Sequence, residues 1–576
     1  MSRSSTVALV AATAAGRALV ARLDAGLANT TAVVDHGSAA GSLRGAFDEH
    51  AAVVAVLAAG AVVRILAPQI AAGDKATDPA VLVIDEAGRF VTPLLGGHAA
   101  GANRLATQIA GVLGAQAVLS TATDAAGLPG LDDLGWPVTG DVAAVTRRLL
   151  DGEQVVVTSE QRWPLPALGA NVRHELGGAS GDVVITDRPV DAAPGTVVLH
   201  PPSLVAGMGA SRGVSADEAE RLLRRALDDA GLAPGSLAAI TSADLKADEA
   251  GLVEVARRLG LPFITHTAEA LGAVAVPNPS ETVRAAVGIP SVAEAAAVLG
   301  AGHTSLGRLV VAKTASTMAT VAIARHAPRG RLAIVGIGPG APELLTPLAA
   351  AELRRAEVVV GLDQYVEQIR GLLRPGTTVL ESGLGREEER AREAREQAAR
   401  GRAVALIGSG DAGVYAMASP TLEGADAGID VVGVPGVTAG LAASAVLGAP
   451  LGHDHCYLSL SDLHTPWEAI ERRVRAVADA DLVLLCYNPR SVKRDWQLGR
   501  ALELLAPHRP GSTPIGVVRN ASRPDESSWI TTLDAFDAEL VDMYCIVIVG
   551  SSQTKIVGGR MVTPRGYRWQ YEEDGG

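Results

Sequence analysis

The segment from Arg331 to Leu353, RLAIVGIGPGAPELLTPLAAAEL, constrains the fold of this chain more than any other. An apolar run leads directly into glycines at 336, 338 and 340 and then into a helical pattern. Glycine adopts positive φ and lets a ligand approach the main chain, so the segment predicts a strand, a ligand-binding turn and a helix. A purely structural turn would fit the same glycines.

Pro339 restricts the kind of ligand that this turn can hold. Dinucleotide-binding turns hold a pyrophosphate through backbone N–H groups, and proline lacks that donor. S-adenosylmethionine fits better because it carries a sulfonium, a carboxylate and an adenosine but no phosphate. A nicotinamide-dependent oxidoreductase is the alternative, with GIGPGA as its glycine motif and Asp363 as its ribose-binding acid.

Three further segments run from an apolar strand into a glycine-rich or polar turn: RAVALIGSGDAGVYAMA, DVVGVPGVTAG and DLVLLCYNPRS. They carry Asp411, Thr438, Tyr487 and Asn488 just after their strands. Ligands of open α/β sheets bind at the carboxyl ends of strands, so these turns are expected to converge on one crevice. For Asp411 and Thr438, helix capping is the competing interpretation.

GIGPGAPELLT, GSGDAGVYAMA and VPGVTA, in this order, resemble the cofactor motifs of the tetrapyrrole (uroporphyrin-III C/corrin) methyltransferases. VVGLDQYVEQI, YNPRSVKRDWQL and VVRNASRPDE are similar to the precorrin-3B C(17)-methyltransferase branch, which contracts the macrocycle in cobalamin synthesis. The resemblance covers about 331–567. It implies two unequal α/β lobes, 331–448 and 449–567, with the cofactor and the macrocycle in the cleft between them.

The resemblance implies S-adenosylmethionine as cofactor and a precorrin or cobalt-precorrin macrocycle as substrate, methylated at C-17. The expected cofactor-binding residues are Gly338, Pro339, Gly340, Gly408, Ser409, Gly410, Asp411, Val414, Tyr415, Thr438, Ala439 and Asn520. The sulfonium methyl is already activated, so alignment and exclusion of water are the main tasks of the enzyme. Ring contraction calls for an acid or base, and His453, His455, Tyr487 and Asn488 are the candidates, although neighbouring loop histidines can equally be structural.

Two basic loops beside these motifs are expected to bind the acetate and propionate groups of the macrocycle. The expected substrate-binding residues are Arg490, Lys493, Arg494, Arg519 and Arg523. Guanidinium groups form charge-assisted bonds to carboxylates, whereas ordinary solvated surface cations are the alternative interpretation. The net charge of −13 argues against a nucleic-acid partner. The charged run REEERAREAREQAARGRA, 386–403, predicts an exposed helix without chemistry.

Positions 1–325 lack these motifs but alternate between strand and helix patterns. LLGGHAAGANRLA, STATD, GMGASRG, DLKADE and IPSVAEAAAV resemble the cobalamin biosynthesis CbiG family, which includes cobalt-precorrin-5A hydrolases. The resemblance implies CbiG-like N-terminal and central regions at 1–200 and a C-terminal domain at 201–326. His98, in a glycine turn before a helix, is a candidate catalytic base, and a capping or core role is the alternative.

The C-terminal part of this CbiG-like region departs from its family. Its glycine turn commonly carries a cysteine and paired basic residues, whereas this chain has Ala210, Ser211 and Arg212. Two interpretations follow, a working hydrolase or a noncatalytic tetrapyrrole-binding module. For the hydrolase, Lys246 and Glu249 are candidates to polarise a carbonyl and orient the substrate, and solvated helix-start charges are the alternative.

Length and composition agree with an α/β enzyme of two to four domains, since the chain has 576 residues of which 48% are hydrophobic. The three cysteines, at 456, 486 and 545, have no metal-ligand spacing and predict reduced core residues and no metal site. TVALVAATAAG predicts a first strand rather than a signal sequence, and no apolar run reaches the roughly 20 residues that span a bilayer. We expect a cytoplasmic protein without a membrane partner, a linker at His326–Arg331, and a homodimer formed through the methyltransferase half.

Overall fold

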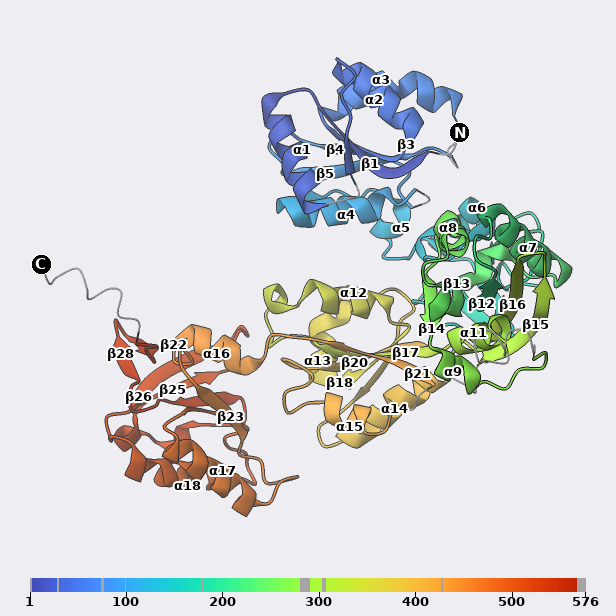
Figure 1. Cartoon of the computed structure of the whole chain (residues 1–576). Helices are drawn as coiled ribbons and strands as arrows, with labels where there is room; N and C mark the ends of the chain where they lie inside the picture. Colours follow the sequence, from blue (N-terminus) through green and yellow to red (C-terminus); the bar gives the residue numbers. More distant parts are fainter. Residues whose placement is uncertain are drawn as a thin grey trace, which may run out of the picture. The chain divides into compact units, whose positions relative to one another are not determined.

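The computed structural model describes residues 3–27, 31–73, 77–98, 100–178, 180–279, 291–302, 307–425 and 428–566. The chain forms two compact units, drawn in Figure 1 from blue to red along the sequence. The first holds 1–162, 167–328 and 374–376, and the second holds the remaining residues. The division at Pro328 and Arg329 falls inside the segment expected to be a linker.

The first sheet of the first unit has the strand order β2-β1-β3-β4-β5-β6. Its strands are β1 (Ser4–Ala11), β2 (Thr31–Val33), β3 (His50–Val56), β4 (Ala80–Ile84), β5 (Phe90–Leu95) and β6 (Gln116–Ala117). Its helices are α1 (Ala14–Gly26), α2 (Ala39–Glu49), α3 (Ala59–Ala72) and α4 (Ala102–Leu113). TVALVAATAAG therefore begins with a strand, as predicted, and β1 lies between β2 and β3, both parallel to it, with Ala8, Leu9 and Val10 buried.

Two more sheets complete the first unit. One has the order β7-β11-β10-β8-β9 and the other β14-β13-β12-β16-β15. The first contains β7 (Val138–Gly140), β8 (Val155–Ser159), β9 (Val172–Leu176), β10 (Val183–Ile185) and β11 (Val197–Leu199), with α5 (Ala122–Ala125) and α6 (Val142–Leu150) before and after β7. The second contains β12 (Leu204–Ala210), β13 (Leu237–Ala243), β14 (Phe263–His266), β15 (Gly307–Ala315) and β16 (Ala319–His326), with α7 (Ala216–Asp229), α8 (Ala250–Leu259), α9 (Ala268–Gly272) and α11 (Ala293–Gly300). Ile289 and Pro290 of the motif IPSVAEAAAV lie outside the described residues.

Helix α7 begins at a serine cap. The Ser215 hydroxyl accepts a hydrogen bond from the Glu218 N–H at 3.2 Å. The Glu218 carboxylate does not return to the cap, as a capping box would require, because it accepts from the Ser316 hydroxyl at 2.6 Å and the Met318 N–H at 2.8 Å. It therefore fastens the helix to the turn between β15 and β16.

The second unit contains a five-stranded parallel sheet with the order β19-β18-β20-β17-β21, here called the first lobe. Its strands are β17 (Gly330–Gly336), β18 (Val358–Leu362), β19 (Thr378–Ser382), β20 (Ala403–Gly408) and β21 (Ile429–Val434). Its helices are α12 (Pro347–Arg355), α13 (Asp363–Ile369), α14 (Glu387–Ala399) and α15 (Ala418–Leu422), whereas the next helix, α16 (Ala439–Leu447), packs against the sheet of the second lobe described below. Every residue of β18 and β20 is buried, as expected for central parallel strands covered on both faces.

The second lobe is a mixed sheet with the order β23-β24-β27-β25-β26. It contains β23 (His455–Ser459), β24 (Val483–Tyr487), β25 (Pro514–Arg519), β26 (Ser527–Thr532) and β27 (Cys545–Val549), with α17 (Trp467–Asp479) and α18 (Gln497–Leu505). A small sheet contains β22 (Gly448–Ala449), β28 (Lys555–Val557) and β29 (Arg560–Val562), in the order β22-β29-β28. It contacts α16 through β22. Strand β27 is antiparallel to β24 and β25, so its amino end lies at their carboxyl ends.

The charged run 386–403 does form a helix, α14, but one face of it is buried. Arg390 and Gln397 are 6% and 6% exposed, and Ala391, Ala394 and Ala398 pack in the core of the first lobe. The prediction of an exposed helix was therefore wrong for this face, because the alanines between the charges form an apolar stripe at helical spacing.

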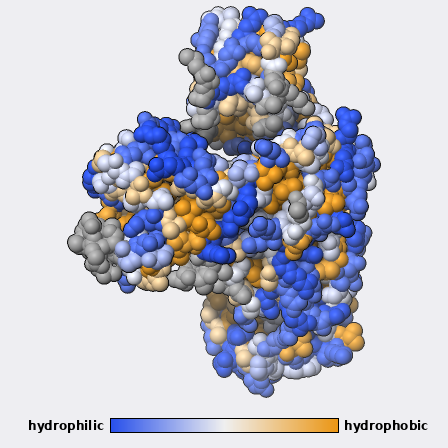
Figure 2. Space-filling model, turned by 90° about the vertical axis from the view of Figure 1, so that its right-hand side faces the viewer, coloured by the Kyte–Doolittle hydropathy of each residue, from blue (hydrophilic) through white to orange (hydrophobic). Residues whose placement is uncertain are grey.

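Hydrophilic residues cover much of the face drawn in Figure 2, with hydrophobic residues in patches between them. Within the described part of the chain, no helix combines the length and apolar character that crossing a membrane requires.

Candidate functional site

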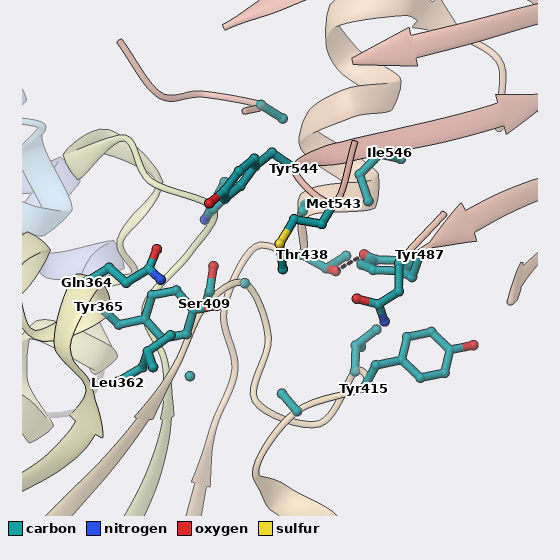
Figure 3. Close-up of a pocket in the computed structure, with 18 of the residues that line it drawn as sticks. Leu362, Gln364, Tyr365, Ser409, Tyr415, Thr438, Tyr487, Met543, Tyr544 and Ile546 are labelled. Atoms are coloured by element: carbon teal, nitrogen blue, oxygen red, sulfur yellow. Dashed lines mark hydrogen bonds between the residues drawn. The ribbon is translucent and has the colours of Figure 1, made fainter. Parts of the chain in front are cut away.

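The second unit contains a cavity of about 370 Å³ at the carboxyl ends of the strands of both lobes. Figure 3 places Gln364 and Tyr365 on one side of it, opposite Tyr415 and Tyr487. Its wall consists of Pro339, Leu362, Gln364, Tyr365, Leu384, Glu387, Arg390, Ile407, Gly408, Ser409, Gly410, Val414, Tyr415, Ala416, Met417, Thr438, Ala439, Tyr487, Asn488, Asn520, Ala521, Arg523, Met543, Tyr544, Cys545 and Ile546. The turns after β17, β20 and β21 therefore converge, as the sequence predicts.

The glycines of these turns are required by contacts between backbones. The N–H of Gly410 donates to the Gly338 carbonyl at 2.7 Å, and the N–H of Gly338 donates to the Gly410 carbonyl at 3.1 Å. A Cβ at Gly436 would lie 2.1 Å from the Gly410 carbonyl oxygen, so no larger residue fits there. Gly338 and Gly340 lie outside the cavity wall, and a Cβ at Gly340 would meet the Arg523 side chain at 2.6 Å.

Asp411 and Thr438 both join parts of the site rather than cap helices. The Asp411 carboxylate accepts from the N–H of Gly413 at 2.8 Å and from that of Gly436 at 3.0 Å, and it lies outside the cavity wall. Thr438 stands at the N-cap position of α16 but makes no capping hydrogen bond with its side chain. Its hydroxyl lines the cavity and bonds the Tyr487 hydroxyl (Figure 3).

Tyr487, the last residue of β24, fastens the start of α16 beside the cavity. Its hydroxyl bonds Thr438 and accepts from the Gly440 N–H at 2.9 Å. Burial raises the pKa of Tyr487 above its ordinary value, so the phenol is neutral at pH 7. The Tyr415 ring lies 5.3 Å from the Tyr487 ring, and its hydroxyl donates to the Tyr457 carbonyl at 2.8 Å, which links the first lobe to the second.

Strained backbone collects at the same place. Tyr415, Asn488 and Asn520 line the cavity with positive φ of 51°, 49° and 49°, and Ser522 has a φ of 63°. Such conformations cost of order 1–3 kcal/mol each in residues with a side chain, and they concentrate where a protein holds a ligand. The Asn520 amide donates to Asp525 at 2.6 Å. The observation supports a functional role for these turns beyond packing.

The five predicted substrate-binding cations separate into two groups. Arg523 lines the cavity, and its Nε donates to the Pro339 carbonyl at 3.1 Å. The guanidinium of Arg519 is already paired with Asp542 at 2.9 Å and Asp525 at 3.3 Å. Those carboxylates hold Arg519 beside the cavity rather than in its wall.

The other three cations lie outside the cavity wall. Arg490 donates to the Ala538 carbonyl at 2.8 Å, and Arg494 donates to the Ser461 hydroxyl at 3.2 Å. Lys493 belongs to the same loop. The structure therefore brings only Arg523 of the predicted set to the cavity.

The two histidines of the second lobe lie away from the cavity wall. His455 is the first residue of β23, whereas the cavity lies at the carboxyl end of that strand. Four residues of extended chain span about 13 Å. The Nδ1 of His453 accepts from the Asp454 N–H at 2.7 Å, and both histidines are exposed. Sequence proximity to the motifs did not reveal which end of the strand carries them.

Several wall residues escaped the sequence interpretation. Leu362, Gln364 and Tyr365 follow β18, and an apolar strand ending in polar residues was the available signal. Met543 to Ile546 enter the wall because β27 is antiparallel to its neighbours, so its beginning meets their ends. Arg390 and Glu387 enter it from α14.

In the first unit, His98 belongs to a partly buried polar cluster. Its Nε2 lies 2.6 Å from the Thr123 hydroxyl and 3.7 Å from the Asp124 carboxylate. The Asn103 amide donates to Asp124 at 2.8 Å. The Nδ1 of His98 and the Oδ1 of Asn103 are buried and make no hydrogen bond with the residues described. The cluster therefore retains two polar atoms that a water molecule or ligand could satisfy.

The loops GMGASRG and DLKADE meet in the third sheet of the first unit. Glu249, 3% exposed, accepts from the Gly213 N–H at 2.9 Å, and Lys246 lies 3.5 Å from the same carboxylate. Arg212 pairs with Asp248 at 2.8 Å on the exposed surface. The interpretation as a solvated helix-start charge therefore fits Asp248 but is wrong for Glu249, which ties the two loops together.

Cysteine and metal chemistry have little support in the described residues. They contain no group of three or more His, Cys, Asp or Glu placed to hold a metal ion. Cys486 is fully buried, and burial raises its pKa to about 12. Burial likewise raises the pKa of Cys545, in the cavity wall, to about 12, so both thiols are protonated at neutral pH.

The family model described as tetrapyrrole (corrin/porphyrin) methylases matches residues 331–537. The "Probable cobalt-factor III C(17)-methyltransferase" of Salmonella typhimurium is 46% identical over 239 residues, which cover 41% of this chain and 99% of that protein. The chain belongs to the tetrapyrrole methylases. A second member of this methylase family, the "Precorrin-3B C(17)-methyltransferase" of a Sinorhizobium species, is 43% identical over 40% of this chain and 91% of that protein.

Ahead of the methylase region, two further family models match. Cobalamin synthesis G N-terminal matches residues 42–124, and Cobalamin synthesis G C-terminus matches 204–324. Both expected resemblances are therefore confirmed, as is the multidomain α/β class. Among solved structures, that of the methyltransferase CobJ is 38% identical, covers 41% of this chain and all of its own, and gives a TM-score of 0.38.

Proposed function

We propose that residues 331–566 methylate C-17 of precorrin-3B, or of its cobalt counterpart, and contract the ring to a precorrin-4-type product in cobalamin biosynthesis. One observation supports this most strongly. Nine of the twelve expected cofactor residues line one cavity, in a region 46% identical to nearly all of a cobalt-factor III C(17)-methyltransferase. The remaining three, Gly338, Gly340 and Asp411, hold the turns that form the cavity.

The cavity wall suits S-adenosylmethionine better than a dinucleotide. In the glycine turn after β17, the N–H of Gly338 already donates to the Gly410 carbonyl at 3.1 Å. A pyrophosphate would call for more free donors at the glycine turn, where Pro339 has none. Asp363, the ribose-binding acid of the oxidoreductase alternative, accepts from the Gln364 N–H at 2.7 Å and lies outside the wall.

S-adenosylmethionine supplies a methyl group that is already activated. The protein then has to align the ring carbon with that methyl and keep water away, for which a cavity closed by bonds between two lobes is suited. Tyr487 stays protonated at pH 7, so its hydroxyl serves as a donor and positioning group rather than as a base. We propose Arg523 as a contact for a carboxylate of the macrocycle.

Calorimetry of the full chain with S-adenosylhomocysteine and with NAD tests the cofactor. We expect binding of the former only, and NAD binding alone would refute the proposal. Incubation with labelled S-adenosylmethionine and either precorrin-3B or cobalt-factor III then tests the substrate. Label in neither macrocycle, despite cofactor binding, would contradict C-17 methylation, and the preferred macrocycle distinguishes the aerobic from the anaerobic route.

For the first unit we propose a second activity, the opening of the ring-A δ-lactone of a cobalt-precorrin-5A with release of acetaldehyde. The matches to both cobalamin synthesis G models and the His98 cluster support it. His98 would activate water through its unsatisfied ring nitrogen. Acetaldehyde release by the full chain, lost in folded His98→Ala, is the expected result. Tight macrocycle binding without acetaldehyde would instead support a noncatalytic binding module.

A cytoplasmic location and a homodimer formed through the methyltransferase half complete the proposal. Light scattering of the full chain and of a 331–576 fragment tests the dimer, which requires each of them to have twice its own monomer mass.

A further inference from the structure

Arg390 is a cation that belongs neither to the residues expected to bind the cofactor nor to those expected to bind the substrate. It lies in the first turn of α14, its side chain is 7% exposed, and it lines the cavity. A buried guanidinium needs acceptors for its donors, because an unpaired buried charge is costly. Its place in the cavity wall means that a bound ligand can supply some of them.

The protein satisfies only part of this guanidinium. Arg390 donates to the Ser382 hydroxyl at 3.1 Å, to the Gly383 carbonyl at 2.8 Å and to the Glu387 carboxylate at 2.8 Å. An arginine has five N–H donors, so three bonds leave two for another acceptor. Glu387 is 46% exposed and also receives the Gly385 N–H at 3.3 Å, so it neutralises Arg390 incompletely.

The place of Arg390 separates it from the turns expected to hold the cofactor. Those turns follow β17, β20 and β21, whereas Ser382, which holds Arg390, ends β19. In the sheet order, β19 lies two strands from β20, or about 10 Å at the usual strand spacing. Gln364 and Tyr365 follow β18, the strand between β19 and β20, and line the cavity on the side opposite Tyr415 and Tyr487 (Figure 3).

We propose that Arg390 binds a carboxylate substituent of the macrocycle, and so fixes the orientation of the substrate beside the methyl donor. This inference rests on the proposed methyltransferase function. Glu387 is the only acidic residue in the wall, so a substrate carboxylate meets one competing anion there. Arginine suits the task because its planar fork matches a carboxylate with two parallel bonds. With Arg523 on the other lobe, the cavity then holds an acidic macrocycle at two points.

Fluorescence titration of the full chain with uroporphyrin and with its methyl ester tests the proposal, because only the acid can pair with Arg390. In Arg390→Gln we expect about 10- to 100-fold weaker binding of the acid, the loss of a charge-assisted bond, and unchanged binding of the ester. Arg392→Gln is the matched control, since Arg392 lies on the same helix, is 64% exposed and has only a 3.8 Å contact with Glu396. Equal losses for acid and ester would overturn the proposal.

Two further measurements separate the other outcomes. Binding of S-adenosylhomocysteine reports the cofactor, and a loss there, with the porphyrin unaffected, would assign Arg390 to the cofactor carboxylate and overturn the proposal. Failure of the wild-type chain to bind S-adenosylhomocysteine would refute the methyltransferase function instead. If Arg390→Gln does not fold, Glu387→Gln removes only the competing anion, and we expect tighter binding of the acid but not of the ester. No acid-specific change would overturn the proposal.

Discussion

The cavity of the second unit and the His98 cluster of the first are both built at glycine turns, but they differ in where their polar atoms point. In the cavity, Ser409, Asn488 and Gln364 belong to the wall of about 370 Å³ of free space. In the cluster, the polar atoms are bonded to one another, since the His98 ring bonds Thr123 and the Asn103 amide donates to Asp124. A glycine turn in the sequence therefore marks close backbone packing, and neighbouring strands decide whether space for a ligand remains.

The largest effect is expected where a glycine of the cavity turns acquires a side chain. A Cβ at Gly436 would lie 2.1 Å from the Gly410 carbonyl, so Gly436→Ala should lower the free energy of unfolding by about 3 kcal/mol or more and abolish binding of S-adenosylhomocysteine. Gly433→Ala is the control, because nothing lies within 4 Å of its Cβ. Urea denaturation measures both, and equal stability of the two variants would contradict the packing argument.

Asp411→Ala tests whether the carboxylate supports the turns or holds the cofactor. It removes bonds to the N–H groups of Gly413 and Gly436, which should cost about 1.5–3 kcal/mol of stability. Because Asp411 lies outside the cavity wall, the increase in melting temperature on adding S-adenosylhomocysteine should persist. Loss of that increase in a variant of unchanged stability would assign the carboxylate to the cofactor.

Tyr487→Phe tests the bonds that fasten the start of α16 to the end of β24. Removal of the hydroxyl leaves the Gly440 N–H and Thr438 without their partner, so we expect the free energy of unfolding to fall by about 1–2 kcal/mol. Thr438→Val should then destabilise the Tyr487→Phe variant less than it destabilises the wild type. Full additivity of the two substitutions in thermal unfolding would show that the hydroxyls are not coupled.

The pH dependence of the same group has a definite sign. Because burial raises the pKa of Tyr487, its contribution to stability is complete below the unfolded pKa near 10 and is lost as the pH rises through the higher folded value. The free energies of unfolding of the wild type and of Tyr487→Phe should therefore become equal only in alkaline solution. A difference that disappears between pH 6 and 8 would contradict this.

The smallest effect on stability is expected in the first unit. His98→Gln removes an imidazole that has one hydrogen-bond partner and one unsatisfied nitrogen, so it should cost about 1 kcal/mol. Binding of S-adenosylhomocysteine by the second unit should not change. Calorimetry and thermal unfolding measure the two quantities, and a large loss of stability would make the cluster a packing element rather than a site.

The sequence predicted the elements of the second unit well because the signals are local. An apolar run, a glycine turn and a helical pattern lie next to one another, and β17, β20 and β21 with their turns follow these signals. The side chains that reach the site were harder to predict. Arg519 and Arg523 stand four residues apart in one motif, yet Asp542, far along the chain, pairs with the first and leaves only the second in the cavity wall.

By itself, the sequence determined the α/β class, the two resemblances and the turns on which the cofactor cavity is built, since each depends on spacing along the chain. Only the tertiary structure decided which side chains reach that cavity. The antiparallel direction of β27 brings Met543 to Ile546 into the wall, and the parallel direction of β23 places His455 at the far end. The buried face of α14 turns Arg390 inward. Strand direction and helix orientation depend on contacts between distant segments, and these contacts leave no local pattern in the sequence.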